Sequence, residues 1–353
     1  LLYSPTRRMP SRCVKLRFDS GLKPTEEHGE GIIRRFSFAH IGHFNQPTQL
    51  YLSILRRRPR LIHMHSIFMP NDALLFVISG ILGRIAGSKI VFTTHGIHET
   101  ADFVYGRMTL VTSRIVKWFV RFFYFGVASF ANLSHNHVIA LSQQDVKKLQ
   151  LIGIKTNHSV IPNGYDRVRN VRRAPIPNLA LCVTRFDLNK GLVTLVEAIK
   201  ILRDSKVDVV LALVGPVTNQ AYFKRVVCMI TDYGLEDRVE VLGYVKEEKL
   251  TQLYETARVF VLPSDVETLP LTLCEAVSYG IPVVATNTGG IPSIIQDGLN
   301  GYLVEPRNPE ELAMKIRRVM RQDFAIEQPL PLPTWEEVAK RTERIYRQLM
   351  RVP

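Results

Sequence analysis

Short runs of consecutive apolar residues alternate with amphipathic stretches along most of the chain. Each run ends at a turn-forming residue, which is typical of strands that are buried on both faces of a parallel sheet. The amphipathic stretches between them have the periodicity of helices. This alternation predicts an α/β protein with parallel sheets. The predicted strands occupy residues 61–66, 89–96, 137–142, 159–166 with its Pro-Asn-Gly turn, 179–185, 209–215, 239–245 and 259–264.

A polar, proline-rich stretch divides these elements into two sets, and we interpret it as an interdomain linker. We expect a Rossmann-like domain at residues 1–166, the linker at 167–178, a second domain at 179–332 and a last helix at 333–353. The fold class is therefore α/β, with two doubly wound domains. In such domains, ligands bind beyond the carboxyl ends of the strands.

Two carboxylates lie close to a strand end in residues 259–303. Glu267 is in the loop after the predicted strand, and Glu275 is inside the following helix, where Pro270 suits the first position because it has no N–H. A carboxylate inside that helix can accept hydrogen bonds from both hydroxyls of a ribose, and a carboxylate on the loop can reach a sugar. As an isolated pair, however, a loop Glu and a surface-helix Glu are common.

Two cations flank the turn after residues 179–185. Arg185 ends this strand, and Lys190 with Gly191 precedes the next helix. A helix N-terminus with two cations suits a diphosphate, although cations also begin many surface helices.

A pair of glycines follows the next predicted strand of the second domain. Gly289 and Gly290 allow the backbone to approach another group closely, because they have no side chain. We expect Pro292 to start a further helix.

The chain has 353 residues, which is enough for two domains, and a formal charge of +14. Residues 1–173 hold 25 basic and 9 acidic residues, a surplus of 16, whereas the remainder holds 21 basic and 23 acidic residues. Such a field attracts phospholipid, a polyprenyl diphosphate or nucleic acid. The basic clusters are short, so solvated surface charge explains them equally well; they are Arg56–Arg58 with Arg60, and Arg169, Arg172 and Arg173.

The apolar segments are too short, or too interrupted by Arg, to predict a membrane-spanning helix. Residues 117–130 mix Lys and Arg with Trp and Phe, which suits a helix at a membrane interface or a core helix with a basic rim. The four cysteines have no CxxC spacing, so we expect a reducing compartment and a cytoplasmic protein, peripheral on the membrane if bound there.

Histidines on the first predicted strand offer a weaker metal hypothesis. His63 and His65 share one face of this strand, which is compatible with zinc, but no further ligands accompany them. We therefore favour packing or cleft lining for both, as for His98, His135 and His137.

Many blocks of the chain resemble one family in the right order. The run SDVETLPLTLCEAVSYGIPVVATNTGGIPSIIQDGLNGYLV is similar to the signature of family 4 retaining glycosyltransferases, which have the GT-B fold. Further similar blocks are TTHG, VIALS, VIPNGYD, VTRFDLNKGLVTLVEAI, LVGP, LGYVKEEKLTQLYETARVFVLPS and TWEEVAKRTERIYRQL. The resemblance covers most of residues 60–350. It implies an acceptor-side first domain, a nucleotide-sugar-binding second domain and a C-terminal helix that crosses back to the first.

The resemblance also implies roles for individual residues. Arg185 and Lys190 would bind the donor diphosphate, Glu275 the ribose and Glu267 the transferred sugar, and His95 would face the reacting sugar. The backbone of Thr268, Leu269, Pro270 and Leu271 would lie along the sugar and phosphate, and the base pocket would be lined by Gly215, Gly243, Tyr244 and Val245.

The reaction implied is transfer of a hexose or N-acetylhexosamine, with retention, from a UDP- or GDP-sugar to a glycan or polyprenyl-linked acceptor. No metal or other cofactor is required, and we expect no nucleic-acid partner. Alternatives are a non-catalytic protein of this fold that binds anions or membrane, and a nucleotide-sugar epimerase. A phosphorylase is disfavoured because no pyridoxal-phosphate lysine motif is recognisable.

The chain departs from the family pattern in two places. Thr268 stands where the family often has Gly. The first strand and its glycine-rich loop are not recognisable, so we expect the chain to be truncated at its N-terminus.

Overall fold

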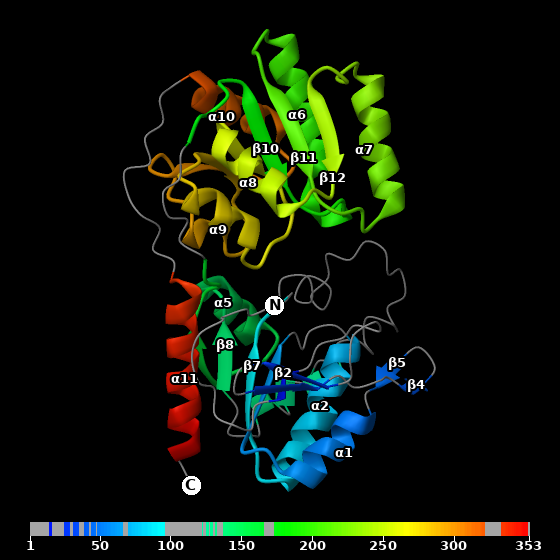
Figure 1. Cartoon of the computed structure of the whole chain (residues 1–353), viewed down its shortest axis with the longest axis vertical. Coiled ribbons are helices and arrows are strands. Elements are labelled where there is room, and N and C mark those ends of the chain that lie inside the picture. The colour runs from blue at the N-terminus through cyan, green and yellow to red at the C-terminus, as the bar shows by residue number, and fades with distance from the viewer. Residues whose placement is uncertain are drawn as a thin grey trace. The chain divides into compact units, whose positions relative to one another are not determined.

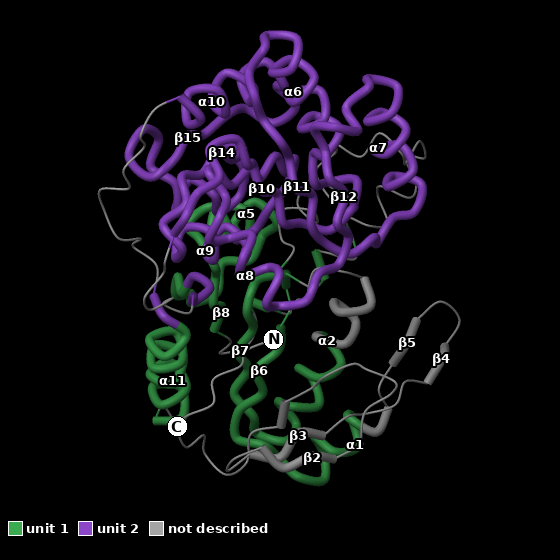
Figure 2. Tube along the Cα trace, turned by 45° about the horizontal axis from the view of Figure 1, so that its top comes forward, with its two compact units in different colours: residues 1–161, 335–353 green, residues 162–334 purple. Residues whose placement is uncertain are grey.

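A computed structural model of the chain shows two compact units, residues 1–161 with 335–353 and residues 162–334 (Figures 1 and 2). The residues that the structure describes are 48–65, 70–95, 137–165, 173–321 and 333–351, with short strands before residue 47 and short helical segments between 122 and 132. The predicted interfacial helix at 117–130 lies largely outside these residues, as do His98, His135, Arg169 and Arg172.

The unit at residues 162–334 is built on a six-stranded parallel sheet, ordered β12-β11-β10-β13-β14-β15. The chain adds β11 and β12 on one side of β10, then returns and adds β13, β14 and β15 on the other side. The direction of winding therefore reverses between β10 and β13, which is where such sheets bind ligands. The strands are β10 (Leu179–Val183), β11 (Val210–Val214), β12 (Val239–Gly243), β13 (Val259–Leu262), β14 (Val283–Thr286) and β15 (Gly301–Val304).

Helices cover both faces of this sheet, which explains why its central strands are almost wholly apolar: every residue of β13 and β14 is buried. Leu195, Ile199 and Ile316 pack with Cys182 and Leu213 in the core of one face. Helices α8 and α9 contact the strands from the other face. The helices are α6 (Leu192–Asp204), α7 (Gln220–Asp232), α8 (Glu247–Thr256), α9 (Leu271–Ser278) and α10 (Pro309–Arg321), with a 3₁₀ turn, η1 (Leu188–Lys190), before α6.

The other unit contains a four-stranded parallel sheet, ordered β6-β7-β8-β9. Ile90, Phe92 and Val138 are buried on one face with Leu149 of α5. Its elements are α1 (Thr48–Arg57), β6 (Leu61–His65), α2 (Pro70–Ile85), β7 (Lys89–Thr93), β8 (His137–Ala140), α5 (Gln143–Leu151), β9 (Asn157–Val160) and α11 (Trp335–Arg351). Two small sheets precede them: β1 (Val14–Lys15), β2 (Thr25–His28) and β3 (Gly31–Arg34), then β4 (Ala39–Ile41) and β5 (Phe44–Gln46).

The last helix, α11, belongs to this unit although it follows the other one in sequence. Val338 and Ile345 on its apolar face pack against Val91, Ile139 and Ile161 of the four-stranded sheet unit. Burial of this stripe is what stabilises a helix whose remaining surface is charged. None of the helices within the described residues combines the length and the hydropathy that a membrane-crossing segment needs.

Two local predictions about prolines are wrong. Pro292 does not start an α-helix: Ile291–Ser293 form a single 3₁₀ turn, η2. The reason is the side chain of Asn300, which accepts from Gln296 N at 2.8 Å and donates to Ile294 O at 2.9 Å. These bonds replace the backbone hydrogen bonds that an α-helix would make with the same groups. Pro270 is the N-cap of α9, with extended ψ of 123°, rather than its first helical residue.

Candidate active site

The loops that leave the carboxyl edge of the six-stranded sheet contact one another through their backbones. Asp265 N, after β13, donates to Asn189 O in η1 at 2.9 Å. Gly290 N, after β14, donates to Thr268 O at 2.6 Å, and Gly215 N, after β11, donates to Gly243 O at 2.8 Å. These bonds fix the loops on which the predicted binding residues lie.

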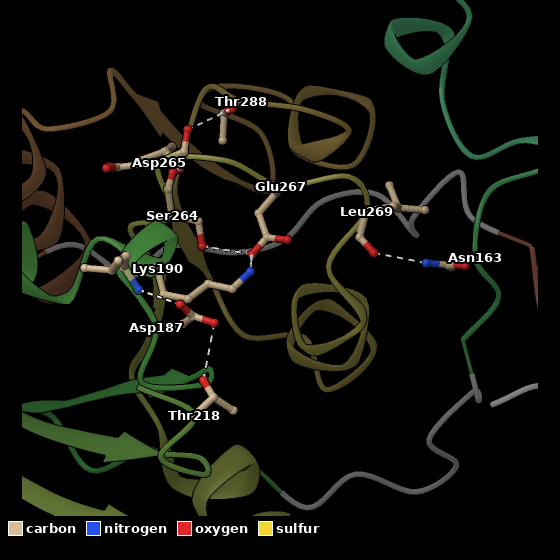
Figure 3. A network of polar contacts seen from close by, with 11 residues as sticks. Asn163, Asp187, Lys190, Thr218, Ser264, Asp265, Glu267, Leu269 and Thr288 are labelled. Carbon is tan, nitrogen blue, oxygen red and sulfur yellow. Dashed lines mark hydrogen bonds and ion pairs between the residues drawn. The ribbon is translucent and has the colours of Figure 1, made fainter. Parts of the chain in front are cut away.

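A lysine and a glutamate meet at the point where the winding of the sheet reverses (Figure 3). Lys190 Nζ lies 2.6 Å from Glu267 Oε1, and only 12% and 11% of the two side chains are exposed. Ser264 Oγ donates to the same carboxylate oxygen at 2.9 Å. Because both charges are largely removed from water, each one compensates the other, and removing one partner would leave an unpaired charge.

Glycines are required where the neighbouring loops press on this pair. Gly289 has φ of 55°, and a Cβ there would lie 1.6 Å from Glu267 O. Gly191 has φ of 61°, and a Cβ there would lie 1.9 Å from Pro263 O. The close approach expected at Gly289 and Gly290 therefore exists, and its partner is the backbone of the Glu267 loop.

The other two predicted charged residues lie on the same edge without joining this pair. Arg185 follows β10, is exposed, and makes no side-chain hydrogen bond or ion pair with the residues that the structure describes. Glu275 lies within α9 and is exposed, and its Oε2 accepts from Tyr254 Oη at 2.8 Å. The structure thus brings Lys190 and Glu267 into contact and leaves Arg185 and Glu275 facing solvent.

The residues predicted to line the base pocket are on the loops after β11 and β12. Gly215 has φ of 142°, and a Cβ there would lie 1.9 Å from Thr184 O. Gly243 has φ of 62° and redirects the chain toward Tyr244, which is 81% exposed, and Val245. An exposed aromatic ring beside a backbone of two glycines is suited to stacking on a flat ring.

The backbone at Thr268, Leu269, Pro270 and Leu271 is held by contacts that sequence reasoning did not assign. Besides the bond from Gly290 N to Thr268 O, Asn163 Nδ2 donates to Leu269 O at 3.0 Å (Figure 3). Asn163 belongs to the Pro-Asn-Gly turn after β9, so its position was visible in the sequence but its partner was not. Leu269 is buried and Leu271, the first residue of α9, is exposed.

His95, in the other unit, is the last member of a row of three imidazoles. Its Nε2 lies 3.2 Å from His65 Nδ1, and the two rings are stacked with centroids 5.4 Å apart. His65 also stacks on His63, with centroids 4.5 Å apart. His63 is held at both nitrogens, by Thr93 Oγ1 at 2.8 Å and by the Tyr346 hydroxyl of α11. The alternation of His63 and His65 predicted a shared face, but not His95 or Tyr346 as neighbours.

Burial favours the neutral forms of His63 and His95, and a buried carboxylate holds the residue before His95. Burial lowers the pKa of His63 well below the ordinary value, and His65 and His95 lower it further. Burial also lowers the pKa of His95, against the opposing effect of Asp145. Asp145 accepts from Thr94 Oγ1 at 2.7 Å and Ser142 Oγ at 2.8 Å, which fixes the residue preceding His95.

Arg173 does not contribute to a basic surface cluster, contrary to the sequence interpretation. Its guanidinium donates to Ala257 O at 2.5 Å and to Gly280 O at 2.6 Å. These carbonyls lie at the C-terminal ends of α8 and α9, where the helix dipole favours a cation. Arg173 therefore joins two helices of the unit.

Within the described parts of the chain, no three His, Cys, Asp or Glu side chains are grouped so that they could hold a metal ion. Asp265 is paired with Arg307, whose Nε lies 2.8 Å from its Oδ2. Burial raises the pKa of the Cys274 thiol to about 12, so it is not ionised at neutral pH.

Comparison with known proteins assigns the chain to a family. The sequence model of the glycosyl transferases group 1 matches residues 167–330, and that of Glycosyltransferase Family 4 matches residues 16–169. The two matches overlap at residues 167–169 and together span residues 16–330. The chain thus belongs to the group 1, family 4 glycosyltransferases. The resemblance seen in the sequence is confirmed.

Curated relatives agree with this assignment. A putative colanic acid biosynthesis glycosyltransferase, WcaL, of Salmonella typhimurium is 30% identical over 51% of this chain and 46% of its own length. The gpi3 subunit of phosphatidylinositol N-acetylglucosaminyltransferase of Schizosaccharomyces pombe is 27% identical over 83% of this chain and 62% of its own length. The chain thus spans less than two thirds of the length of these relatives.

Solved structures share the fold. Sucrose-phosphate synthase from Thermosynechococcus elongatus has a TM-score of 0.71 at 22% identity, covering 96% of this chain and 89% of that protein. Anabaena HepE in complex with UDP and glucose has a TM-score of 0.64 at 22% identity, covering 89% and 85%. The predicted GT-B fold class is confirmed.

Proposed function

We propose that the chain is a retaining glycosyltransferase whose nucleotide-sugar donor binds at the carboxyl edge of the six-stranded sheet. The observation that carries this proposal is the contact between Lys190 and Glu267 at the reversal between β10 and β13. A cation suits the diphosphate and a carboxylate suits sugar hydroxyls, and both kinds of group occur in one donor. The Anabaena relative was solved with UDP-glucose, which is a donor of this kind.

Lys190 and Arg185 act on the leaving group. The acceptor hydroxyl attacks the anomeric carbon from the face that the diphosphate leaves, the bond from this carbon to the diphosphate oxygen breaks, and the acceptor proton passes to a donor phosphate oxygen. Negative charge grows on the departing diphosphate during this step. Two cations positioned beforehand stabilise this charge, which is the largest contribution that a site of this kind makes.

The remaining residues orient the donor. Glu267, held by Lys190 and Ser264, accepts from hydroxyls of the transferred sugar. Glu275 binds the ribose, and Gly215 and the 243–245 loop receive the base. The backbone of residues 268–271 lies along the sugar and phosphate. The family resemblance implies that His95, whose Nε2 lies 3.2 Å from His65 Nδ1, contacts the transferred sugar.

The acceptor is a glycan or a lipid-linked glycan, and the protein is peripheral on an anionic membrane surface. The relatives are named for colanic acid biosynthesis and for transfer to phosphatidylinositol. Residues 48–95 contain six basic residues and one acidic residue. Helices α1 and α2 are neighbours, and each carries both exposed aliphatic and basic residues. These are Leu52, Leu55, Arg56 and Arg57 on α1, and Ile81, Ile85 and Arg84 on α2. Aliphatic and basic residues together suit a lipid headgroup layer.

Donor consumption tests this proposal. We expect release of UDP or GDP from one member of a panel of UDP-, GDP- and dTDP-sugars, and a loss of this release in Glu267→Ala. Glu336→Ala, on α11, is a control that removes an exposed carboxylate, whose Oε1 lies 2.9 Å from Lys340 Nζ. Donor consumption that is unchanged in Glu267→Ala would contradict the assignment.

An epimerase and a non-catalytic anion-binding protein are the alternatives. An epimerase would convert the sugar without releasing the nucleoside diphosphate, so the same assay distinguishes it. A binding protein would retain affinity for nucleoside diphosphates in Glu267→Ala and release none. The carboxylate beside Lys190 disfavours it, because an anion-binding cleft has no use for Glu267.

A further inference from the structure

Tyr254 of α8 contacts Glu275, the side chain that we propose for ribose binding. Both the ring and the hydroxyl of Tyr254 are held by neighbouring residues. The ring is 2% exposed. It stacks on Tyr279 with centroids 5.1 Å apart and an interplanar angle of 15°, and its centroid lies 6.1 Å from that of Phe260 in β13. Its hydroxyl donates to Glu275 Oε2 at 2.8 Å.

This hydrogen bond has a fixed direction. Burial raises the pKa of Tyr254, and the neighbouring carboxylate of Glu275 raises it further. The phenol therefore stays protonated over the whole working range of pH and donates, and Glu275 accepts. A buried donor on a stacked ring holds an otherwise exposed glutamate in one orientation.

Helix α8 connects two parts of the proposed donor site. It begins at Glu247, one residue after the 243–245 loop, and lies beside α9 (Figure 1). Tyr254 follows two turns along it. Helix α9 carries Glu275, and its C-cap is Tyr279, on which Tyr254 stacks. The same pair of helices is joined at its C-terminal ends by Arg173.

We propose that Tyr254 is a positioning residue that fixes Glu275 for recognition of the nucleotide ribose; the proposal rests on the ribose role of Glu275 given above. A glutamate side chain loses conformational freedom when it binds, and one that is already held loses less. Tyr254 therefore strengthens binding most for nucleotides that carry both ribose hydroxyls, and less for those that lack the 2′-hydroxyl.

The test compares UDP with 2′-deoxy-UDP by isothermal titration calorimetry on the full chain; if UDP does not bind, GDP and 2′-deoxy-GDP are used. The measured quantity is the ratio of the two dissociation constants, which we call the ribose preference. Because both ligands are titrated into the same protein, loss of folded protein cancels in the ratio. We expect Tyr254→Phe to lower the ribose preference by about 3- to 10-fold.

Two further variants complete the test. Glu275→Ala should abolish the ribose preference. Tyr233→Phe makes the same chemical change at the end of α7, where Lys200 lies over the ring, and should retain the wild-type preference. A wild-type preference in Tyr254→Phe, together with a loss in Glu275→Ala, would overturn the role of Tyr254 alone. A preference that survives in Glu275→Ala, or no binding of either nucleotide, would overturn the ribose role as well.

Discussion

At the carboxyl edge of the six-stranded sheet, a lysine and a glutamate neutralise each other, whereas at the same edge of the four-stranded sheet three imidazoles lie in a row. The first region consists of full charges: Lys190 Nζ and Glu267 Oε1 are 2.6 Å apart. In the second, burial lowers the pKa of His63 and His95 and so favours their neutral forms. His63 and His65 lie within β6, and His95 follows β7. The electrostatics of the two regions therefore differ in kind.

The difference shows what each region can do. A buried ion pair can exchange partners when a charged ligand enters, since a phosphate can replace the carboxylate beside Lys190. Imidazoles in their neutral form, which burial favours at His63 and His95, offer a ligand donors and acceptors at fixed positions rather than a charge. We infer that the first region binds and stabilises the leaving diphosphate, and that the second orients neutral hydroxyls.

Removing the cation of the first region should have the largest effect. We expect Lys190→Ala to lower donor turnover by about 10²- to 10³-fold, because this cation stabilises charge that grows in the transition state. The measurement is the rate of nucleoside diphosphate release at saturating donor. Lys200→Ala, which breaks an exposed pair with Asp204 on α6, is the matched control. Equal losses in the two variants would show that Lys190 has no special role.

Substitution of a glycine that is packed against the first region should have the second-largest effect on donor turnover. Gly289→Ala places a Cβ against Glu267 O in a left-handed conformation, so we expect the Glu267 loop to move and donor turnover to fall with it. The left-handed conformation alone costs roughly 1–2 kcal/mol of stability. Gly298→Ala shares this conformation, with φ of 84°, but its Cβ would meet nothing within 4 Å. Gly298→Ala should lower the midpoint of chemical unfolding and retain the turnover per folded molecule. A loss of turnover per folded molecule in Gly298→Ala but not in Gly289→Ala would contradict the structure.

The second region should respond to pH. The ordinary pKa of 6.5 applies to the unfolded chain, and burial lowers the pKa of His63 and His95 in the folded chain. Below pH 6.5 the unfolded chain therefore binds more protons than the folded one, so stability is full above this pH and falls as the pH decreases. The titratable groups that surround these rings are Asp145, Tyr346 and His65. All three are retained when a histidine variant is compared with the wild type.

We expect the free energy of unfolding to fall from pH 7 to pH 5 through these groups, and His63→Gln to remove part of this fall. Urea titrations at the two pH values measure it. His158→Gln, at an exposed position on β9, is the control. A pH dependence that is the same in His63→Gln and in the wild type would contradict the lowered pKa of His63.

The sequence predicted the fold and the residues of the first region well, because strand ends, helix starts and glycines are local signals. Lys190 and Glu267 follow two strands that are far apart in the chain, and only the strand order makes them neighbours. The sequence could not predict the contacts around the other candidate residues. Tyr254 contacts Glu275, Asn163 contacts Leu269 and Tyr346 contacts His63, and in each case the partner lies on another element. The helix predicted at Pro292 failed because Asn300 takes its backbone partners.

The central claim is that Lys190 binds the donor diphosphate at the reversal between β10 and β13. It is tested most directly by titrating UDP and uridine, or GDP and guanosine, into the wild-type chain and into Lys190→Ala. We predict that the variant binds the nucleoside diphosphate at least about 10-fold more weakly while its affinity for the nucleoside is unchanged, as expected for loss of a charge-assisted contact. Equal affinity of the two proteins for the diphosphate would contradict the account.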